Sequence, residues 1–334
     1  MRYRPDISGL RACAVVPVVL YHLNASLVPG GYVGVDVFFV ISGYLITALI
    51  LADLGARRFS LVTFYDRRIR RIVPAYALMA LATALAALVI LPPAQLVAFG
   101  ESLKAASIFF ANRYFLSATG YFDAGAEQLL LHTWSLSIEE QFYLAWPLLL
   151  VVVSHPRLVR FRGLLVWALL LLSLFAATRN AIRLPERAFY NAGGRFWELL
   201  MGAVLALNLL PHLRRQAVAE GIAALGLAMI LAALALFNHD TLFPGATALL
   251  PTGGALLVLW AGEGGRTTYV GRLLAWTPLV GIGLISYSLY LWHWPVLAVY
   301  RYVTQATPGL TAGMVLLALM LALSVLSWRC RVCC

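Results

Sequence analysis

The feature that most constrains this chain is a succession of about ten long apolar segments, joined by loops that carry most of the charges. Two of them, residues 10–28 and 33–52, follow one another near the N-terminus, and each is long enough to cross a bilayer core as a helix. The other segments are 73–91, 131–153, 163–178, 194–210, 217–237, 246–262, 279–303 and 309–328. Of the 334 residues, 62% are hydrophobic and 12% are charged. The sequence therefore predicts an all-α integral membrane protein, a bundle of about ten transmembrane helices.

The basic residues are concentrated in alternate loops, and this asymmetry predicts the orientation of the helices. Arg2 and Arg4 precede the first segment, and the loop after the second segment is rich in arginine. The arginines of that loop are Arg57, Arg58, Arg67, Arg68, Arg70 and Arg71. Loops on the opposite side carry fewer basic residues, with 179–193 as the exception, so both termini are predicted to be cytoplasmic. The longest outer loop, 95–130, contains an amphipathic stretch, 98–115, that we expect to lie along the membrane surface.

The overall charge and the cysteines argue against several classes of protein. The net charge of +11 does not indicate a nucleic-acid partner, because the arginines lie in short loops between apolar segments. Cys13 lies inside the first segment and the other three cysteines lie at the C-terminus, which is no disulfide framework. No histidine or carboxylate adjoins that terminal cluster, so we expect no metal site. The first segment is not a typical signal peptide, since it lacks a small-residue cleavage site and leads directly into a second span.

Three ionisable residues lie inside the first two apolar segments. Arg11 and His22 are eleven residues apart, which on a helix is about 16 Å along the axis and within about 20° of the same face. Asp36 follows near the start of the next helix. Ionisable groups in a hydrocarbon core are costly, and their presence indicates function.

These residues belong to longer runs with a recognisable pattern. Residues 4–11 read Arg-Pro-Asp-x-x-Gly-Leu-Arg, and residues 34–44 read Gly-x-Asp-x-Phe-Phe-x-x-Ser-Gly-Tyr. Together with the Arg-x10-His spacing, they resemble the acyltransferase-3 family of bacterial membrane O-acyltransferases. Blocks at 132–143, 194–198 and 286–295 extend the resemblance over essentially the whole chain. The resemblance implies a multi-pass protein of the bacterial inner (plasma) membrane and an essential role for Arg11 and His22.

The resemblance implies a cytoplasmic acyl-coenzyme A donor, most commonly acetyl-coenzyme A, as co-substrate and no permanently bound cofactor. Guanidinium groups bind phosphates in a bidentate manner, so the predicted donor-binding residues are arginines on the cytoplasmic side. They are Arg11, Arg67, Arg68, Arg70 and Arg71. The alternative for Arg11 is that it extends to the cytoplasmic interface, and the other four are also explained by topology alone.

His22 is the predicted catalytic residue, either as general base on an acceptor hydroxyl or as a transient acyl carrier. Burial disfavours the imidazolium and keeps the ring able to accept a proton. A nearby carboxylate would orient the ring, and Asp36 and Glu139 are both candidates between which the sequence does not choose. The alternative for His22 is a purely structural role. The alternative for Asp36 and Glu139 is that they serve helix packing.

The predicted acceptor-binding residues lie toward the outer half of the later segments. Glu198 is one, with the alternative that it simply pairs with Arg195. Tyr290 and His293 are the others, in an aromatic block that is either an interfacial belt or a surface on which sugars stack. His132 is expected at an outer interface, where a solvated histidine costs little. The resemblance implies a cell-envelope glycan as acceptor: lipopolysaccharide O-antigen, an exported polysaccharide, peptidoglycan or a lipid-linked sugar.

Two other classes of function remain open alternatives. A secondary transporter or glycan exporter would also have about ten spans with buried charges, although the sequence lacks an inverted repeat and matching broken helices. A non-catalytic membrane scaffold is disfavoured by the buried ionisable residues. The predicted transmembrane domain covers residues 1–328, followed by a short tail over 329–334. Because family members commonly continue with Trp-x-x-Ile/Val-Glu-x-Pro after the last helix, we expect that this end is truncated.

Overall fold

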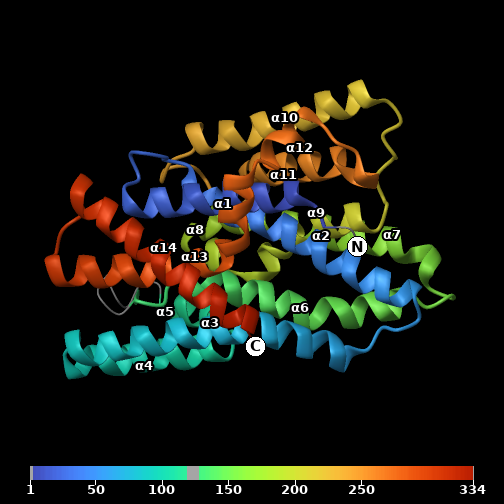
Figure 1. Cartoon of the computed structure of the whole chain (residues 1–334). Coiled ribbons are helices and arrows are strands. Elements are labelled where there is room, and N and C mark those ends of the chain that lie inside the picture. Colours follow the sequence, from blue (N-terminus) through green and yellow to red (C-terminus); the bar gives the residue numbers. More distant parts are fainter. Residues whose placement is uncertain (1–2, 119–127, 334) are drawn as a thin grey trace.

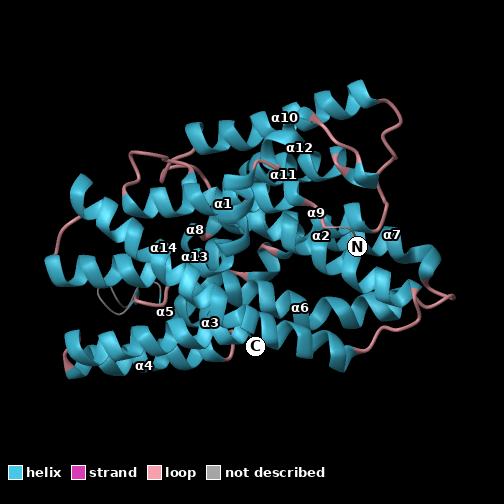
Figure 2. Cartoon of the chain, in the orientation of Figure 1, coloured by secondary structure: helices cyan, strands magenta, loops and turns pink. Residues whose placement is uncertain are grey.

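The computed structural model describes residues 3–118 and 128–333, and every regular element within these two ranges is a helix. Residues 119–127 of the predicted outer loop and residue 334 of the predicted tail lie outside the described residues. Figures 1 and 2 show these helices and the loops between them. Short 3₁₀ turns join several of the α-helices. The α-helices are α1 (Pro5–Leu23), α2 (Gly34–Gly55), α3 (Leu61–Ile90), α4 (Pro93–Ser107), α5 (Ala111–Ala118), α6 (Thr133–Val153), α7 (Arg162–Arg183), α8 (Pro185–Tyr190), α9 (Phe196–Ala206), α10 (Gln216–Leu236), α11 (Leu249–Ala261), α12 (Tyr269–Leu274), α13 (Thr277–Thr304) and α14 (Leu310–Cys333).

The predicted membrane bundle is confirmed. Eight helices in the described part of the chain are long and apolar enough to cross a membrane, and two shorter apolar helices, Phe196–Ala206 and Ala246–Ala261, complete the set. In Figure 1 the long helices run roughly along one common direction, with α10 and α11 on one flank and α3 and α4 on the other. The helices α1, α2 and α13 lie between these flanks.

Two helix boundaries differ from the sequence prediction in ways that bear on the site. The third span was expected to start at residue 73, but α3 begins at Leu61, where the Ser60 hydroxyl accepts a hydrogen bond from the backbone N–H of Thr63. This N-cap satisfies an otherwise unpaired helix N–H, so the arginine-rich stretch is helical instead of loop. The predicted amphipathic stretch over 98–115 is divided, because α4 ends at Ser107 and α5 starts at Ala111.

Glycines bring the central helices into close contact. A Cβ atom on Gly43 of α2 would collide with the backbone carbonyl of Leu199 in α9, and one on Gly202 of α9 would collide with the carbonyl of Val40. Small residues allow such backbone approach between membrane helices. Gly43, the glycine of the Ser-Gly pair in the second segment, therefore allows α9 to pack closely against α2.

The helices α1 and α13 are seated against each other in the same way. Gly283 of α13 lies against the carbonyl of Ser8 in α1, so no side chain fits between the two backbones. Further along this interface, the rings of His22 on α1 and His293 on α13 are 5.2 Å apart between centroids. The pair α1–α13 thus carries the residues around which the site is built.

Candidate active site

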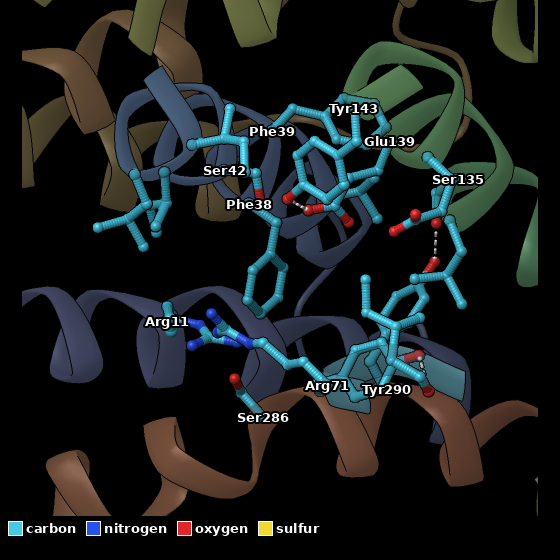
Figure 3. Close-up of a pocket in the computed structure, with 18 of the residues that line it drawn as sticks. Arg11, Phe38, Phe39, Ser42, Arg71, Ser135, Glu139, Tyr143, Ser286 and Tyr290 are labelled. Carbon is cyan, nitrogen blue, oxygen red and sulfur yellow. Dashed lines mark hydrogen bonds between the residues drawn. The ribbon is translucent and has the colours of Figure 1, made fainter. Parts of the chain in front are cut away.

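A cavity that we call the arginine cavity lies between α1, α2, α3, α6 and α13. Its basic lining residues are Arg11, Arg68 and Arg71, and Figure 3 shows the Arg71 side chain extending toward Arg11. Glu139 and Glu140 on α6 line the same space. A cavity with three guanidinium groups is suited to bind a polyanionic ligand.

The helical arrangement of α3 decides which arginines reach this cavity. Arg68 and Arg71 are three residues apart and therefore share a face, and the Arg68 guanidinium lies 5.4 Å from the ring centroid of Tyr143. Arg67 and Arg70 are exposed and point elsewhere: Arg67 forms an ion pair with Asp53 at 3.4 Å, and Arg70 pairs with the neighbouring Asp66 at 3.0 Å. Of the five arginines predicted to bind the donor, the structure gathers Arg11, Arg68 and Arg71 and places Arg67 and Arg70 outside the cavity.

Glu139 lies in the arginine cavity and accepts a hydrogen bond from the hydroxyl group of Tyr143 (Figure 3). This position differs from the prediction that Glu139 orients His22. His22 lines a different cavity, and neither Glu139 nor Asp36 is among its hydrogen-bond, ion-pair or ring partners in the described residues. The predicted carboxylate–histidine pair is therefore not formed in the structure.

The second cavity, which we call the histidine cavity, is lined by His22 and His132. Its walls are largely aromatic, with a guanidinium from α13 at one side. The other aromatic and basic members are Tyr21, Tyr32, Trp134, Phe189, Tyr190, Tyr290, Trp294 and Arg301. Tyr190 lies in the short α8, where burial raises the pKa of its phenol and keeps the hydroxyl protonated as a hydrogen-bond donor. Such a lining offers flat faces and polar edges, which suit a sugar ring.

The hydrogen bonds of His22 define its tautomer. Its Nδ1 lies 2.9 Å from the backbone carbonyl oxygen of Val18, one turn earlier in α1. A carbonyl only accepts, so Nδ1 carries the hydrogen and the neutral ring has its lone pair on Nε2. Arg301 donates to the backbone carbonyl of His22, and the Trp294 ring packs edge-on at 5.0 Å between centroids. His22 is therefore held as a ring that can accept a proton on Nε2.

His293 and His132 lie beside His22 but differ from their predicted positions. His293 is fully buried, its Nδ1 bonds the backbone carbonyl of Tyr290, and it is not a lining residue of either cavity. It therefore packs beside His22, outside the lining of both cavities. His132, expected at a solvated interface, is 3% exposed and 5.8 Å from His293 between ring centroids. Despite these three rings, no group of three or more His, Cys, Asp or Glu side chains among those that the structure describes is arranged to hold a metal ion.

A second set of buried charges, which we call the ion cluster, consists of Asp36, Arg195 and Glu198. The guanidinium of Arg195 lies 3.0 Å from a carboxylate oxygen of Asp36 and 3.0 Å from one of Glu198, and none of the three side chains is exposed. Four aromatic rings surround this guanidinium at 5.4 to 5.7 Å, those of Phe39, Trp134, Phe189 and Phe243. None of the three charged residues lines either cavity.

The ion cluster contains two of the residues that the sequence predicted for the site. Asp36, predicted as catalytic, and Glu198, predicted to bind the acceptor, both have Arg195 as partner in an enclosed site. The alternative that Glu198 pairs with Arg195 is the one the structure shows, at the i,i+3 spacing of one helical turn. Tyr290 is the one predicted acceptor-binding residue that lines the histidine cavity.

Arg301 is the residue of this site that sequence reasoning missed. It lies in the last turn of α13, lines the histidine cavity and donates to the carbonyl of His22. The signal available in the sequence was its position: an arginine at the outer end of a span runs against the positive-inside trend.

The chain is similar to known acyltransferases. A family model described as an acyltransferase domain matches residues 4–329. The Bacillus subtilis protein YrhL is 35% identical over 318 residues, which is 89% of this chain and 49% of that protein. The O-acetyltransferase OatA of Staphylococcus aureus is 31% identical over 310 residues, covering 89% of this chain and 51% of the relative. The peptidoglycan O-acetyltransferase OatA of Listeria monocytogenes is 32% identical over 353 residues, 98% of this chain and 55% of the relative.

The chain thus spans about half the length of the curated relatives that it matches. No solved structure matches it.

Proposed function

Because this chain belongs to the acyltransferase-3 family, we propose that it transfers an acyl group, in the first instance acetyl, from acyl-coenzyme A to a hydroxyl group of a cell-envelope glycan. The observation that carries this proposal is the pair of cavities: one lined by three arginines, the other by a histidine with its lone pair on Nε2. Arg11 lines the first cavity and His22 the second, and the eleven residues between them on α1 correspond to about 16 Å along the helix axis.

The arginine cavity is the proposed donor site. Coenzyme A carries several phosphate charges, and Arg11, Arg68 and Arg71 supply guanidinium groups from two different helices. With the termini in the cytoplasm, as the positive-inside rule predicts, this cavity faces the compartment that contains acyl-coenzyme A. The thioester arm would then extend from these arginines toward His22.

The histidine cavity is the proposed site of the reaction. Nε2 of His22 removes the proton from an acceptor hydroxyl, whose oxygen attacks the carbonyl carbon of the thioester. The carbon–sulfur bond breaks, the acyl group stays on the acceptor oxygen, and the imidazolium returns its proton to the thiolate of coenzyme A. The hydrogen bond from Nδ1 to Val18 fixes the ring for this step. If His22 instead carries the acyl group briefly, the same Nε2 atom is the nucleophile.

Peptidoglycan is the proposed acceptor, and the bacterial inner membrane the proposed location. The aromatic lining of the histidine cavity suits a sugar, and the Listeria monocytogenes relative is named as a peptidoglycan O-acetyltransferase. Lipopolysaccharide O-antigen and exported polysaccharides are the other acceptors that the same cavity would admit.

The decisive test measures transfer of label from acetyl-coenzyme A to envelope glycans in proteoliposomes that contain the full chain, with release of free coenzyme A thiol as a second readout. We expect both signals with the wild type and neither with His22→Ala at equal protein level. A His22→Ala protein that matches the wild type would contradict the mechanism. A wild type that releases no thiol with any envelope glycan would favour the transporter alternative, which consumes no thioester.

A further inference from the structure

The arginine cavity and the histidine cavity share two lining residues, Val35 and Tyr290. Val35 lies in the first turn of α2 and is 8% exposed, and Tyr290 lies in the middle of α13 and is 7% exposed. Every other lining residue belongs to one cavity alone. The two side chains therefore stand where the cavities meet.

The Tyr290 side chain is fixed from a third helix. Its hydroxyl group lies 2.6 Å from Oγ of Ser135 and 3.1 Å from the backbone carbonyl oxygen of His132, at the start of α6. Ser135 Oγ lies 3.2 Å from the same carbonyl oxygen, so the two hydroxyl hydrogens are distributed over three mutually close oxygens. The ring is in edge contact with Phe38, 6.4 Å between centroids. The ring is thus held across the junction by α6 and α2 together (Figure 3).

We propose that Tyr290 and Val35 form the partition between the donor and acceptor cavities, and that this partition determines which acyl groups the protein transfers. The inference rests on the proposed function. A donor held at the arginines has its thioester arm directed at this partition, and the acyl carbon must reach His22 on the other side. A small acyl group such as acetyl can pass between the fixed Tyr290 ring and Val35. A longer acyl chain has to displace these two side chains, more so with each added methylene.

The first experiment compares donors of increasing length: acetyl-, propionyl-, butyryl- and hexanoyl-coenzyme A. In the wild type we expect kcat/KM to fall steeply after acetyl. In Tyr290→Ala we expect the ratio of butyryl to acetyl kcat/KM to rise by about tenfold or more, since one or two methylenes in a packed site change rates on that scale. Tyr300→Ala is the matched control, because Tyr300 lies on the same helix but lines a separate apolar groove. An unchanged ratio in Tyr290→Ala would overturn the proposal.

The second experiment involves no acyl transfer, so its failure is distinguishable from failure of the proposed function. In a background without native cysteines, Ser42→Cys reports on the arginine cavity and Ala25→Cys on the histidine cavity. A membrane-impermeant maleimide is applied to right-side-out and to inverted vesicles. We expect each cysteine to react from one side, opposite for the two sites. Adding Tyr290→Ala should make Cys at position 42 react from both sides, while Tyr300→Ala should not.

Two results would overturn the partition. One is a cysteine at position 42 that reacts from both sides while Tyr290 is present. The other is a Tyr290→Ala protein in which that cysteine still reacts from one side only. Tyr290→Phe keeps the ring but loses both hydrogen bonds, and is expected to give an intermediate shift in chain-length ratio. If Tyr290→Ala does not accumulate, Val35→Ala opens the same junction from α2 and is subject to the same criteria.

Discussion

The protein has two sets of buried charged groups, and they differ in what surrounds them. In the ion cluster, the Arg195 guanidinium faces two carboxylates and four aromatic rings, and no exposed surface remains on any of the three charged side chains. In the site, Arg11, Arg68 and His22 line open cavities. The charges of the ion cluster are enclosed and face one another, whereas the charges that line a cavity border space that a ligand can enter.

From this difference we infer a structural role for the ion cluster and a functional role for the residues that line the cavities. Asp36 lies in the same motif as Ser42 and Gly43, but it fixes α9 to α2 through Arg195. A buried ion pair is weak evidence for net stability, yet removal of one partner leaves an uncompensated buried charge. We therefore predict that substitutions in the ion cluster lower the stability of the fold. Substitutions in the cavities should instead lower the rate of acyl transfer.

The largest effect is expected at His22. In His22→Ala, acetyl transfer should fall by about 10²- to 10⁴-fold, because the group that accepts the acceptor proton is absent. The thermal unfolding midpoint should stay near that of the wild type, since His22 lines a cavity and is only partly buried. Initial rates at matched protein concentration, with His155→Ala as an exposed-histidine control, give the measurement. A large drop in the unfolding midpoint of His22→Ala would show that His22 stabilises the fold.

Arg195→Met should instead destabilise the fold, by about 3 to 5 kcal/mol, because it leaves Asp36 and Glu198 buried without a cation. The measurement is the unfolding midpoint in detergent, together with the amount of protein in the membrane. The triple variant Arg195→Met/Asp36→Asn/Glu198→Gln removes all three charges and should recover part of the loss. If Arg195→Met has normal stability but no turnover, the structural role of the ion cluster is contradicted. The cluster would then take part in the reaction.

The arginines of α3 provide a matched pair of double variants. Arg68→Ala/Arg71→Ala should raise KM for acetyl-coenzyme A by about 10- to 100-fold, which corresponds to one or two lost hydrogen bonds to charged groups. Arg67→Ala/Arg70→Ala removes the same number of charges from the same helix, but these side chains pair with Asp53 and Asp66 outside the cavity. Its KM should change by less than about threefold, because exposed ion pairs contribute little. Equal effects of the two variants would show that the arginines act only through overall charge.

The smallest effect is expected for Glu139→Gln. Glu139 lines the arginine cavity and accepts a hydrogen bond from Tyr143, with no hydrogen bond to His22. A glutamine retains an oxygen that can accept the bond from Tyr143. The rate of acetyl transfer should therefore fall by less than about tenfold, a smaller loss than removal of a general base or its carboxylate partner causes. Exposed Glu101→Gln is the control. A loss of 100-fold or more would indicate that Glu139 reaches His22 during the reaction.

Much of the architecture could be predicted from the sequence for a simple reason. Hydropathy over about twenty residues identifies a membrane helix regardless of its neighbours, so the apolar segments matched the observed helices. Charged stretches have no comparable hydropathy pattern that marks where a helix begins. For that reason the start of α3 was placed at residue 73 instead of Leu61, and the two faces of its arginine run were not separated.

The sequence by itself determined that helices span the membrane, that ionisable groups lie within them, and that Arg11 and His22 share a face of one helix. The tertiary structure alone decided which partner each group has. Asp36 meets Arg195 because Gly43 and Gly202 let α2 and α9 approach closely, and His22 meets His293 because α1 packs against α13. These partners lie far apart in the chain, and no local pattern specifies them, because contact between helices depends on how whole surfaces fit together.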